Sequence, residues 1–138
     1  MAKEKTDSFV KHDPTLWTLD ADWQGTSFRR RMTVMKTLSG GLVIHSAIDL
    51  PDHQWQELEA LGNVEAIIIP NYFHGSEAST YAEKFPTATV FVPSGLLKKI
   101  QRLYPEGRVL SAPSTARNCK QYLCRRELRG KNRHQKCS

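Results

Sequence analysis

Residues 64–93, VEAIIIPNYFHGSEASTYAEKFPTATVFVP, decide the fold of this chain. The run Val64–Ile69 is aliphatic and rich in β-branched residues, which is typical of a strand buried on both faces. Pro70 ends this strand because proline cannot donate a hydrogen bond to a neighbouring strand. Thr89–Val92 is a second strand of the same type, and between the two lies an apolar stripe at helical spacing, formed by Ala78, Tyr81, Ala82 and Phe85. The order strand, helix, strand predicts a parallel βαβ unit.

The segments around this unit extend the same sheet. Three runs before it indicate antiparallel strands, namely 16–22, 30–37 and 42–46, and the dipeptide Gly40-Gly41 is typical of a hairpin between the last two. A helix is expected between residues 51 and 61, with Gly62 as its stop. After the βαβ unit, a helix beginning near Ser94 and a short strand at 108–110 complete the pattern. The sequence therefore predicts an α/β fold with a mixed sheet.

Composition predicts one soluble domain. The chain has 138 residues, of which 39% are hydrophobic and 25% are charged, and these values are ordinary for a globular protein. No apolar run approaches the length of a membrane span, and the first residues lack the apolar core of a secretory signal. We therefore expect a cytoplasmic protein without a membrane partner. Residues 1–15 are expected to be a flexible N-terminus, 16–114 the folded domain and 115–138 a basic tail.

The positive charge is concentrated at the end of the sequence. The formal net charge is +6, but from Arg117 onward there are eight Lys and Arg residues and a single acidic residue, Glu127. All three cysteines also lie in this tail, and an odd number of cysteines without a secretory signal argues against a disulfide framework. Nucleic acid is accordingly a candidate partner through the tail alone, by phosphate contacts.

The candidate site residues follow the first buried strand. In open α/β sheets, ligands bind near the carboxyl ends of the strands, so Asn71 and His74 are the leading candidates, and His45 ends a neighbouring strand. Each has a structural alternative: His74 can bond to the backbone of the turn, Asn71 can stabilise the turn, and His45 can be a half-buried structural residue. Glu77 is expected early in the next helix, where a carboxylate complements the helix dipole.

Several segments together resemble a known family. They are RMTV (31–34), GGLVIHS (40–46), the Pro-Asn turn followed by a histidine three residues after the asparagine, and FPTATVFVP (85–93). From about Trp17 to Ser114 the chain resembles the amino-terminal half of the metallo-β-lactamase fold, in a branch with a degenerate metal motif. The resemblance implies half of an αββα sandwich, with helices on one face of a mixed sheet.

The same resemblance implies a metal site that this sequence completes only in part. Hydrolases of the family carry His-x-His-x-Asp-His on the turn after the equivalent strand, and these side chains bind one or two metal ions, usually zinc. Here Asn71 stands at the first position, Phe73 or His74 at the second, and Gly75 and Ser76 where Asp and His would be. His74 and His45 are the remaining candidate metal ligands, zinc is the candidate ion, and no other cofactor is expected.

The basic tail offers a second set of zinc-type ligands, Cys119, Cys124, His134 and Cys137. Its spacing, C-x4-C-x9-H-x2-C, matches no standard finger or knuckle, so a disordered tail is the better expectation. The composition of residues 115–138 differs so much from that of the body that a frameshift or a truncated gene would account for it.

Three functions are consistent with these features. The first is an atypical metallo-hydrolase-like protein with an incomplete metal motif and little or no hydrolase activity. The second is a non-enzymatic interaction domain, in which an apolar face left by the truncated domain recruits a partner or a second copy. The third is polyanion binding through the basic tail.

Overall fold

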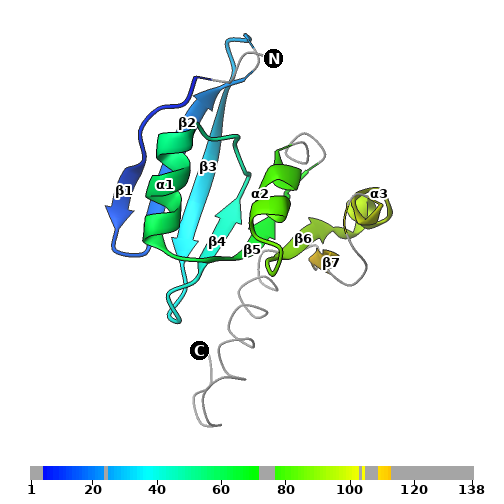
Figure 1. Ribbon diagram of the computed structural model, residues 1–138. Coiled ribbons are helices and arrows are strands. Elements are labelled where there is room, and N and C mark those ends of the chain that lie inside the picture. Colours follow the sequence, from blue (N-terminus) through cyan, green and yellow to red (C-terminus); the bar gives the residue numbers. More distant parts are fainter. Residues whose placement is uncertain (1–4, 24, 72–76, 103, 105–108, 113–138) are drawn as a thin grey trace.

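The computed structural model describes residues 5–23, 25–71, 77–102, 104 and 109–112, which form a seven-stranded sheet with helices (Figure 1). The strands lie in the sheet in the order of the sequence. The first four are antiparallel and the last four are parallel, with the fourth strand common to both parts. The expected α/β class and mixed sheet are confirmed. The strands are β1 (Val10–Asp13), β2 (Leu16–Asp22), β3 (Arg29–Lys36), β4 (Leu42–His45), β5 (Val64–Ile68), β6 (Thr89–Pro93) and β7 (Val109–Ala112).

The described helices cover one face of this sheet, which we call the helix face. They are α1 (Asp52–Leu61), α2 (Ala78–Lys84) and α3 (Leu97–Gln101), and a 3-10 turn (Ser94–Leu96) precedes α3. Trp55 of α1, Tyr81 of α2 and Ile100 of α3 belong to the same hydrophobic cluster, so the three helices share one core. None of the described helices is long and apolar enough to cross a membrane.

Alternation along the strands assigns each side chain to a face. In β2 the buried residues are Trp17, Leu19 and Ala21, and all three belong to the core under the helices. Successive side chains of a strand point to opposite faces, so the residues between them lie on the other side of the sheet, the second face. That face has a small cluster of its own around Val43, Ala66 and Phe91, to which no described helix contributes.

The central βαβ unit forms as its sequence predicts. Val64 and Ile67 of β5 face the helix core and Ala66 faces the second cluster, so the strand is buried on both sides. The predicted stripe of α2 is buried against the sheet, since Ala78 and Tyr81 have no exposed surface. The hairpin between β3 and β4 is also confirmed. The turn contains more residues than Gly40 and Gly41, because the hydrogen bond that closes it runs from the Thr37 amide to the Gly41 carbonyl at 2.8 Å.

The N-terminal segment before residue 16 contributes an edge strand to the sheet. Val10–Asp13 forms β1, which pairs antiparallel with β2, and Thr6 makes an isolated bridge to Ala21. All four residues of β1 are exposed, so this edge strand buries no apolar side chain and shows no hydrophobic alternation. It is held by backbone hydrogen bonds and by a contact of His12 Nε2 with Thr18 Oγ1 at 2.7 Å. A pattern of hydrophobic residues could not have predicted it.

Gly62 allows α1 to end directly against the β3–β4 turn. It is the residue after the helix, its φ is 156°, and a Cβ at this position would lie 2.5 Å from the Gly40 carbonyl oxygen. Beside it, the Leu42 amide donates to the Asn63 carbonyl at 2.8 Å. The close approach of two backbones therefore sets where β5 begins relative to β4.

The substitution Gly62→Ala is expected to lower the free energy of unfolding by about 3 kcal/mol, because it combines an unfavourable φ with a steric overlap. Urea denaturation followed by circular dichroism measures this change. Gly95→Ala is the matched control, since a Cβ there meets no atom within 4 Å and the backbone is not in the left-handed region. It should shift stability by less than about 1 kcal/mol. Equal losses in the two variants would contradict this role of Gly62.

Candidate functional site

The parallel strands β4, β5 and β6 bring their carboxyl ends to one edge of the sheet. His45 ends β4 and is aligned with Ile68 of β5, which is aligned with Phe91 of β6. Asn71 follows β5 on an exposed bend, and α2 begins at Ala78. This strand-end edge is the place where the sequence predicts a site, and His74 lies outside the described residues.

His45 is half buried and points to the second face. Val43, two residues earlier in β4, belongs to the cluster of that face, and the period of a strand places His45 on the same side. Its Nδ1 lies 3.0 Å from Ser46 Oγ. Burial lowers the pKa of His45 below its ordinary value of 6.5, so the neutral imidazole is favoured at neutral pH.

The backbone leaves β4 in an unusual conformation at Ser46. This residue has φ 59°, the one non-glycine residue with positive φ in the described part of the chain, and it is 4% exposed. Its amide donates to the Ile68 carbonyl at 3.2 Å, which extends the β4–β5 pairing by one residue. The turn after β4 is therefore anchored to β5 by the strained residue itself.

Glu77 forms a buried ion pair with Arg30 of β3. The distance from Arg30 Nη2 to Glu77 Oε1 is 3.1 Å, and the two side chains are 5% and 12% exposed. The Arg30 guanidinium also lies over the ring of Trp23, 6.0 Å from its centroid. The pair joins the first residues of β3 to the start of α2, directly after the turn that carries the predicted site.

Sequence reasoning missed Arg30, although a signal was present. Arg30 occupies the same register in β3 as Met32 and Val34, both of which are fully buried in the helix core. An arginine at an inward position of an alternating strand needs an acidic partner, because a buried charge is stable only when it is paired. The role of Glu77 expected from the helix dipole alone was therefore incomplete.

Tyr81 links α2 to the segment that follows β4. Its hydroxyl donates to the Ile48 carbonyl at 2.7 Å and lies 3.1 Å from Met32 Sδ. Burial raises the pKa of Tyr81 well above its ordinary value, and the carboxylates of Asp49 and Glu77 raise it further. The hydroxyl therefore stays protonated and serves as a structural donor between α2 and the segment after β4.

The structure does not bring the described candidates together as one site. His45 points to the second face, whereas Glu77 contacts Arg30 on the helix face. Asn71 is exposed at the end of β5. His74 and the tail set of Cys119, Cys124, His134 and Cys137 lie outside the described residues.

The described residues do not fit a zinc ion. Zinc in proteins takes three or four ligands of the Cys, His, Asp and Glu types. Within residues 5–23, 25–71, 77–102, 104 and 109–112, no group of three such side chains is arranged to hold a metal ion. Glu77, the acidic residue nearest the predicted turn in sequence, is engaged by Arg30. We therefore derive no chemical step through a metal.

Comparison with known proteins identifies the fold. No family model and no curated protein matches the sequence. Among solved structures, the metallo-β-lactamase FIM-1 from Pseudomonas aeruginosa in its mono-zinc form is similar, with a TM-score of 0.54 and 6% sequence identity. The match covers 82% of this chain and 53% of that chain. The chain thus has a partial metallo-β-lactamase-like fold and spans about half the length of this structural neighbour.

Removing the charge of Glu77 should destabilise the fold strongly. Glu77→Gln removes the carboxylate that pairs with the buried Arg30 guanidinium, and breaking one side of a buried ion pair costs about 3–5 kcal/mol. The free energy of unfolding in urea measures the loss. Glu59→Gln is the matched control, because Glu59 pairs with Lys84 at 3.4 Å on the surface and its loss should cost at most about 1 kcal/mol. Similar losses would contradict the anchoring role of Arg30.

The buried imidazole should make stability depend on pH. Since the pKa of His45 is lower in the folded state than the ordinary 6.5, the unfolded chain binds more protons as the pH falls through this value. His45 should therefore reduce stability below about pH 6.5, by at most about 1.4 kcal/mol per pH unit. The free energy of unfolding between pH 5 and 7 should fall less steeply in His45→Asn than in the original chain. Parallel curves would show that His45 does not contribute.

Proposed function

We propose that this chain is an atypical metallo-β-lactamase-fold protein that works by self-association, with little or no hydrolase activity. The sequence of the turn after β5 supports the low hydrolase activity, because Asn71, Gly75 and Ser76 stand at ligand positions of the motif implied by the resemblance. The apolar second face supports self-association. Its proposed occupant is the second face of another copy of this chain.

The second face is apolar across the strands from β3 to β7. Met35 is aligned with Val43, Val43 with Ala66, Ile68 with Phe91 and Phe91 with Leu110, and these side chains belong to one cluster. Val43, Ala66 and Phe91 form its centre and are 2%, 3% and 7% exposed within the chain itself, so a second copy would meet mainly the periphery. Its half-buried periphery consists of Met35, Ile68 and Leu110. A sheet that is apolar on both faces requires a layer on each side, and the described helices supply only one.

A second sheet is the partner that fits such a surface. Two sheets pack face to face about 10 Å apart with interdigitating side chains, and an apolar sheet face is suited to that packing. A second copy brings the same patch and can pair with it through two-fold symmetry. The comparison supports this choice, because the match leaves about half of the neighbour's chain without a counterpart here. Two copies face to face would form a helix, sheet, sheet, helix arrangement.

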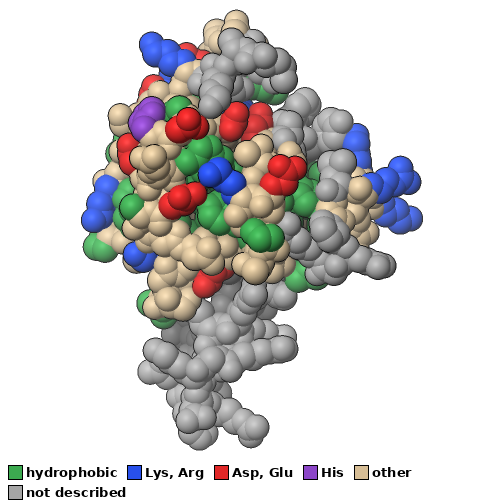
Figure 2. Space-filling model, in the orientation of Figure 1, with side chains coloured by type: hydrophobic (Ala, Val, Ile, Leu, Met, Phe, Trp, Pro, Cys, Tyr) green, Lys and Arg blue, Asp and Glu red, His purple; other side chains and the backbone are tan. Residues whose placement is uncertain are grey.

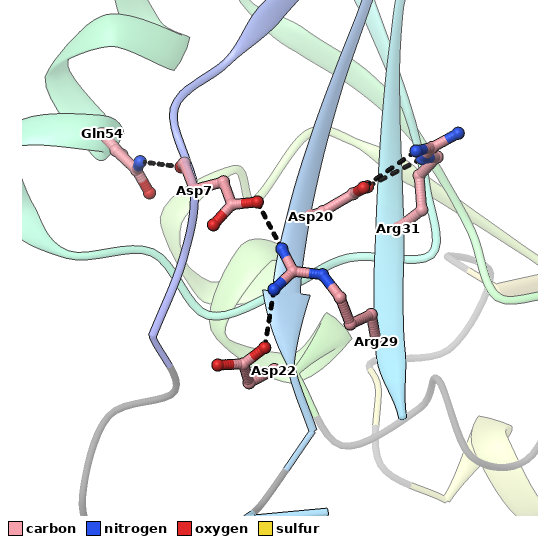
Figure 3. A network of polar contacts seen from close by, with 6 residues as sticks. All are labelled: Asp7, Asp20, Asp22, Arg29, Arg31 and Gln54. Carbon is pink, nitrogen blue, oxygen red and sulfur yellow. Dashed lines mark hydrogen bonds and ion pairs between the residues drawn. The ribbon is translucent and has the colours of Figure 1, made fainter. Parts of the chain in front are cut away.

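A charged border on β2 and β3 would set the orientation of the two copies. Asp20 accepts two hydrogen bonds from Arg31, at 2.7 and 2.8 Å, and Arg29 contacts both Asp22 and Asp7 (Figure 3). Asp20 and Asp22 alternate with the buried Leu19 and Ala21, which places them on the side of the second face. Exposed ion pairs contribute little stability, but a polar rim around an apolar centre favours particular alignments.

The proposal predicts a dimer that a charge on the second face disrupts. Light scattering coupled to size-exclusion chromatography should give twice the chain mass of 15.7 kDa at micromolar concentration. Leu110→Lys places a charge in the patch and should weaken the association roughly tenfold or more.

Leu38→Lys is the matched control, because Leu38 lies in the β3–β4 turn and is 92% exposed. It should leave the dimer unchanged, and circular dichroism of both variants establishes that they are folded. A monomer of the original chain across a wide concentration range would overturn the proposal. A dimer insensitive to Leu110→Lys would place the interface elsewhere.

A further inference from the structure

Contacts to three other elements hold the N-terminal segment on the sheet. We call residues 5–13 the strap. The Asp7 amide donates to the Asp20 carbonyl of β2 at 2.8 Å, and the Asp7 carbonyl accepts a hydrogen bond from Gln54 Nε2 of α1 at 2.5 Å. The Asp7 carboxylate also pairs with Arg29 of β3 (Figure 3). The strap is therefore docked on a surface that β2, β3 and α1 form together.

The strap buries little apolar surface of its own. All four residues of β1 are exposed, and the Val10 residue is 53% exposed. Figure 2 shows basic and hydrophobic side chains at the surface on the side of the molecule where β1 lies in Figure 1. Phe9 is the apolar anchor of the strap, because it packs partly buried against the helix core. A segment with few buried apolar contacts opens at a lower free energy than the core, so the strap can detach while the rest of the fold stays intact.

The turn between the strap and β2 has two residues, Pro14 and Thr15, and it is not of a common hairpin type. The common two-residue hairpin turns have positive φ at their first residue, whereas the proline ring holds φ near about −65°. Neither turn residue has positive φ in the structure. A turn of this kind tends to splay its two strands, and the pairing shifts register between Lys11 and Asp13. The hairpin therefore joins the strap to β2 through a connection that matches the strands poorly.

Pro14 is the hinge about which the strap can open. Thr15 stays with the sheet, because its carbonyl accepts a hydrogen bond from the Lys36 amide of β3 at 2.8 Å. A proline restricts the residue before it to extended conformations, so Asp13 is suited to an open arrangement in which the strap continues away from β2. The Asp13 side chain closes the turn, since its Oδ1 accepts from the Thr15 amide at 2.7 Å and from the Thr15 hydroxyl at 2.9 Å. Opening the hinge therefore breaks few local contacts.

We propose that the strap exchanges between two copies of this chain, each strap pairing with β2 of the other copy. The docking surface on β2, β3 and α1 is the same in both arrangements, so each contact of the strap within one chain can be made again between chains. Such an exchange loses the hydrogen bonds of the Asp13 turn and the freedom of one copy, and it replaces the hairpin by an extended hinge. Exchange of an identical element is a low-cost route to a dimer, and it is favoured at high protein concentration.

The free edge of β1 favours exchange over simple addition of another strand. A lysine and an irregular register both oppose pairing at a sheet edge, and β1 carries Lys11 and a register shift. Exchange uses the edge of β2 instead, which the strap already covers. It is also independent of self-association through the second face, whose apolar cluster lies on strands from β3 to β7.

The experiment traps the pairing of the strap with a disulfide. All variants of the full chain carry L110K, which removes association through the second face, and C119S/C124S/C137S, which removes the native thiols. V10C/T18C then adds thiols at two aligned positions, one on the strap and one on β2. The protein is refolded from urea at low and at high concentration and oxidised. A disulfide within one chain is expected at low concentration and a disulfide-linked dimer at high concentration, on a non-reducing gel. V10C alone measures random cross-linking.

A second variant tests the hinge. P14N/T15G gives the turn the sequence Asn-Gly, which favours a type I′ hairpin and therefore the closed arrangement. It should lower the yield of linked dimer roughly tenfold, which corresponds to about 1.4 kcal/mol. L38N is the matched control, because Leu38 lies in the β3–β4 turn and is 92% exposed, and it should leave the yield unchanged.

Three outcomes would overturn the inference. The first is a disulfide within one chain at every concentration, and the second is a dimer yield no higher than that of V10C alone. The third is the same dimer yield with the original turn and with P14N/T15G, which would remove the hinge from the process. None of these outcomes bears on the second face, because that interface is tested by comparing the chain with and without L110K. Circular dichroism of each variant establishes that it is folded.

Discussion

Strands β4 and β5 carry apolar side chains on both of their faces, and this constraint governs the rest of the structure. A strand of this kind cannot lie at a solvated surface, so it requires strands on each side and a packed layer above and below. The helix layer meets half of this demand through Trp55, Leu58 and Tyr81. The antiparallel strands and β7 extend the sheet laterally. No described helix lies on the second face, which is the surface proposed for self-association.

The sequence allowed much of this architecture to be predicted, because its decisive elements are expressed as local patterns. The aliphatic run of β5 and the stripe of α2 follow from periodicity alone, and both are buried as expected. β1 could not be predicted in this way, because it pairs through its backbone and all its side chains are exposed. The inward position of Arg30 indicated that it needs an acidic partner, but the identity of that partner could not be predicted, since the pair joins residues 47 positions apart and depends on how β3 and α2 approach each other.

The predicted site was harder to anticipate than the fold for a related reason. Sequence order placed His45 and Glu77 near one edge of the sheet, and the structure agrees with this position along the strands. It could not determine on which side of the sheet each side chain lies, because a shift of one residue in register exchanges the two faces. His45 shares its side with Val43, whereas Glu77 joins Arg30 on the helix side. Residues at the same edge of a sheet can thus lie on its opposite faces.

The buried ion pair gives the strand-end edge a structural purpose. Replacing such a pair by apolar residues is often neutral or stabilising, so its value here is better understood as positioning than as stability. Arg30 contacts Glu77, the residue directly before α2, and that contact fixes where the helix begins. Tyr81, one turn later, bonds to the Ile48 carbonyl and holds the segment after β4 against the same helix. Charge and hydrogen bonding at this edge therefore join the elements.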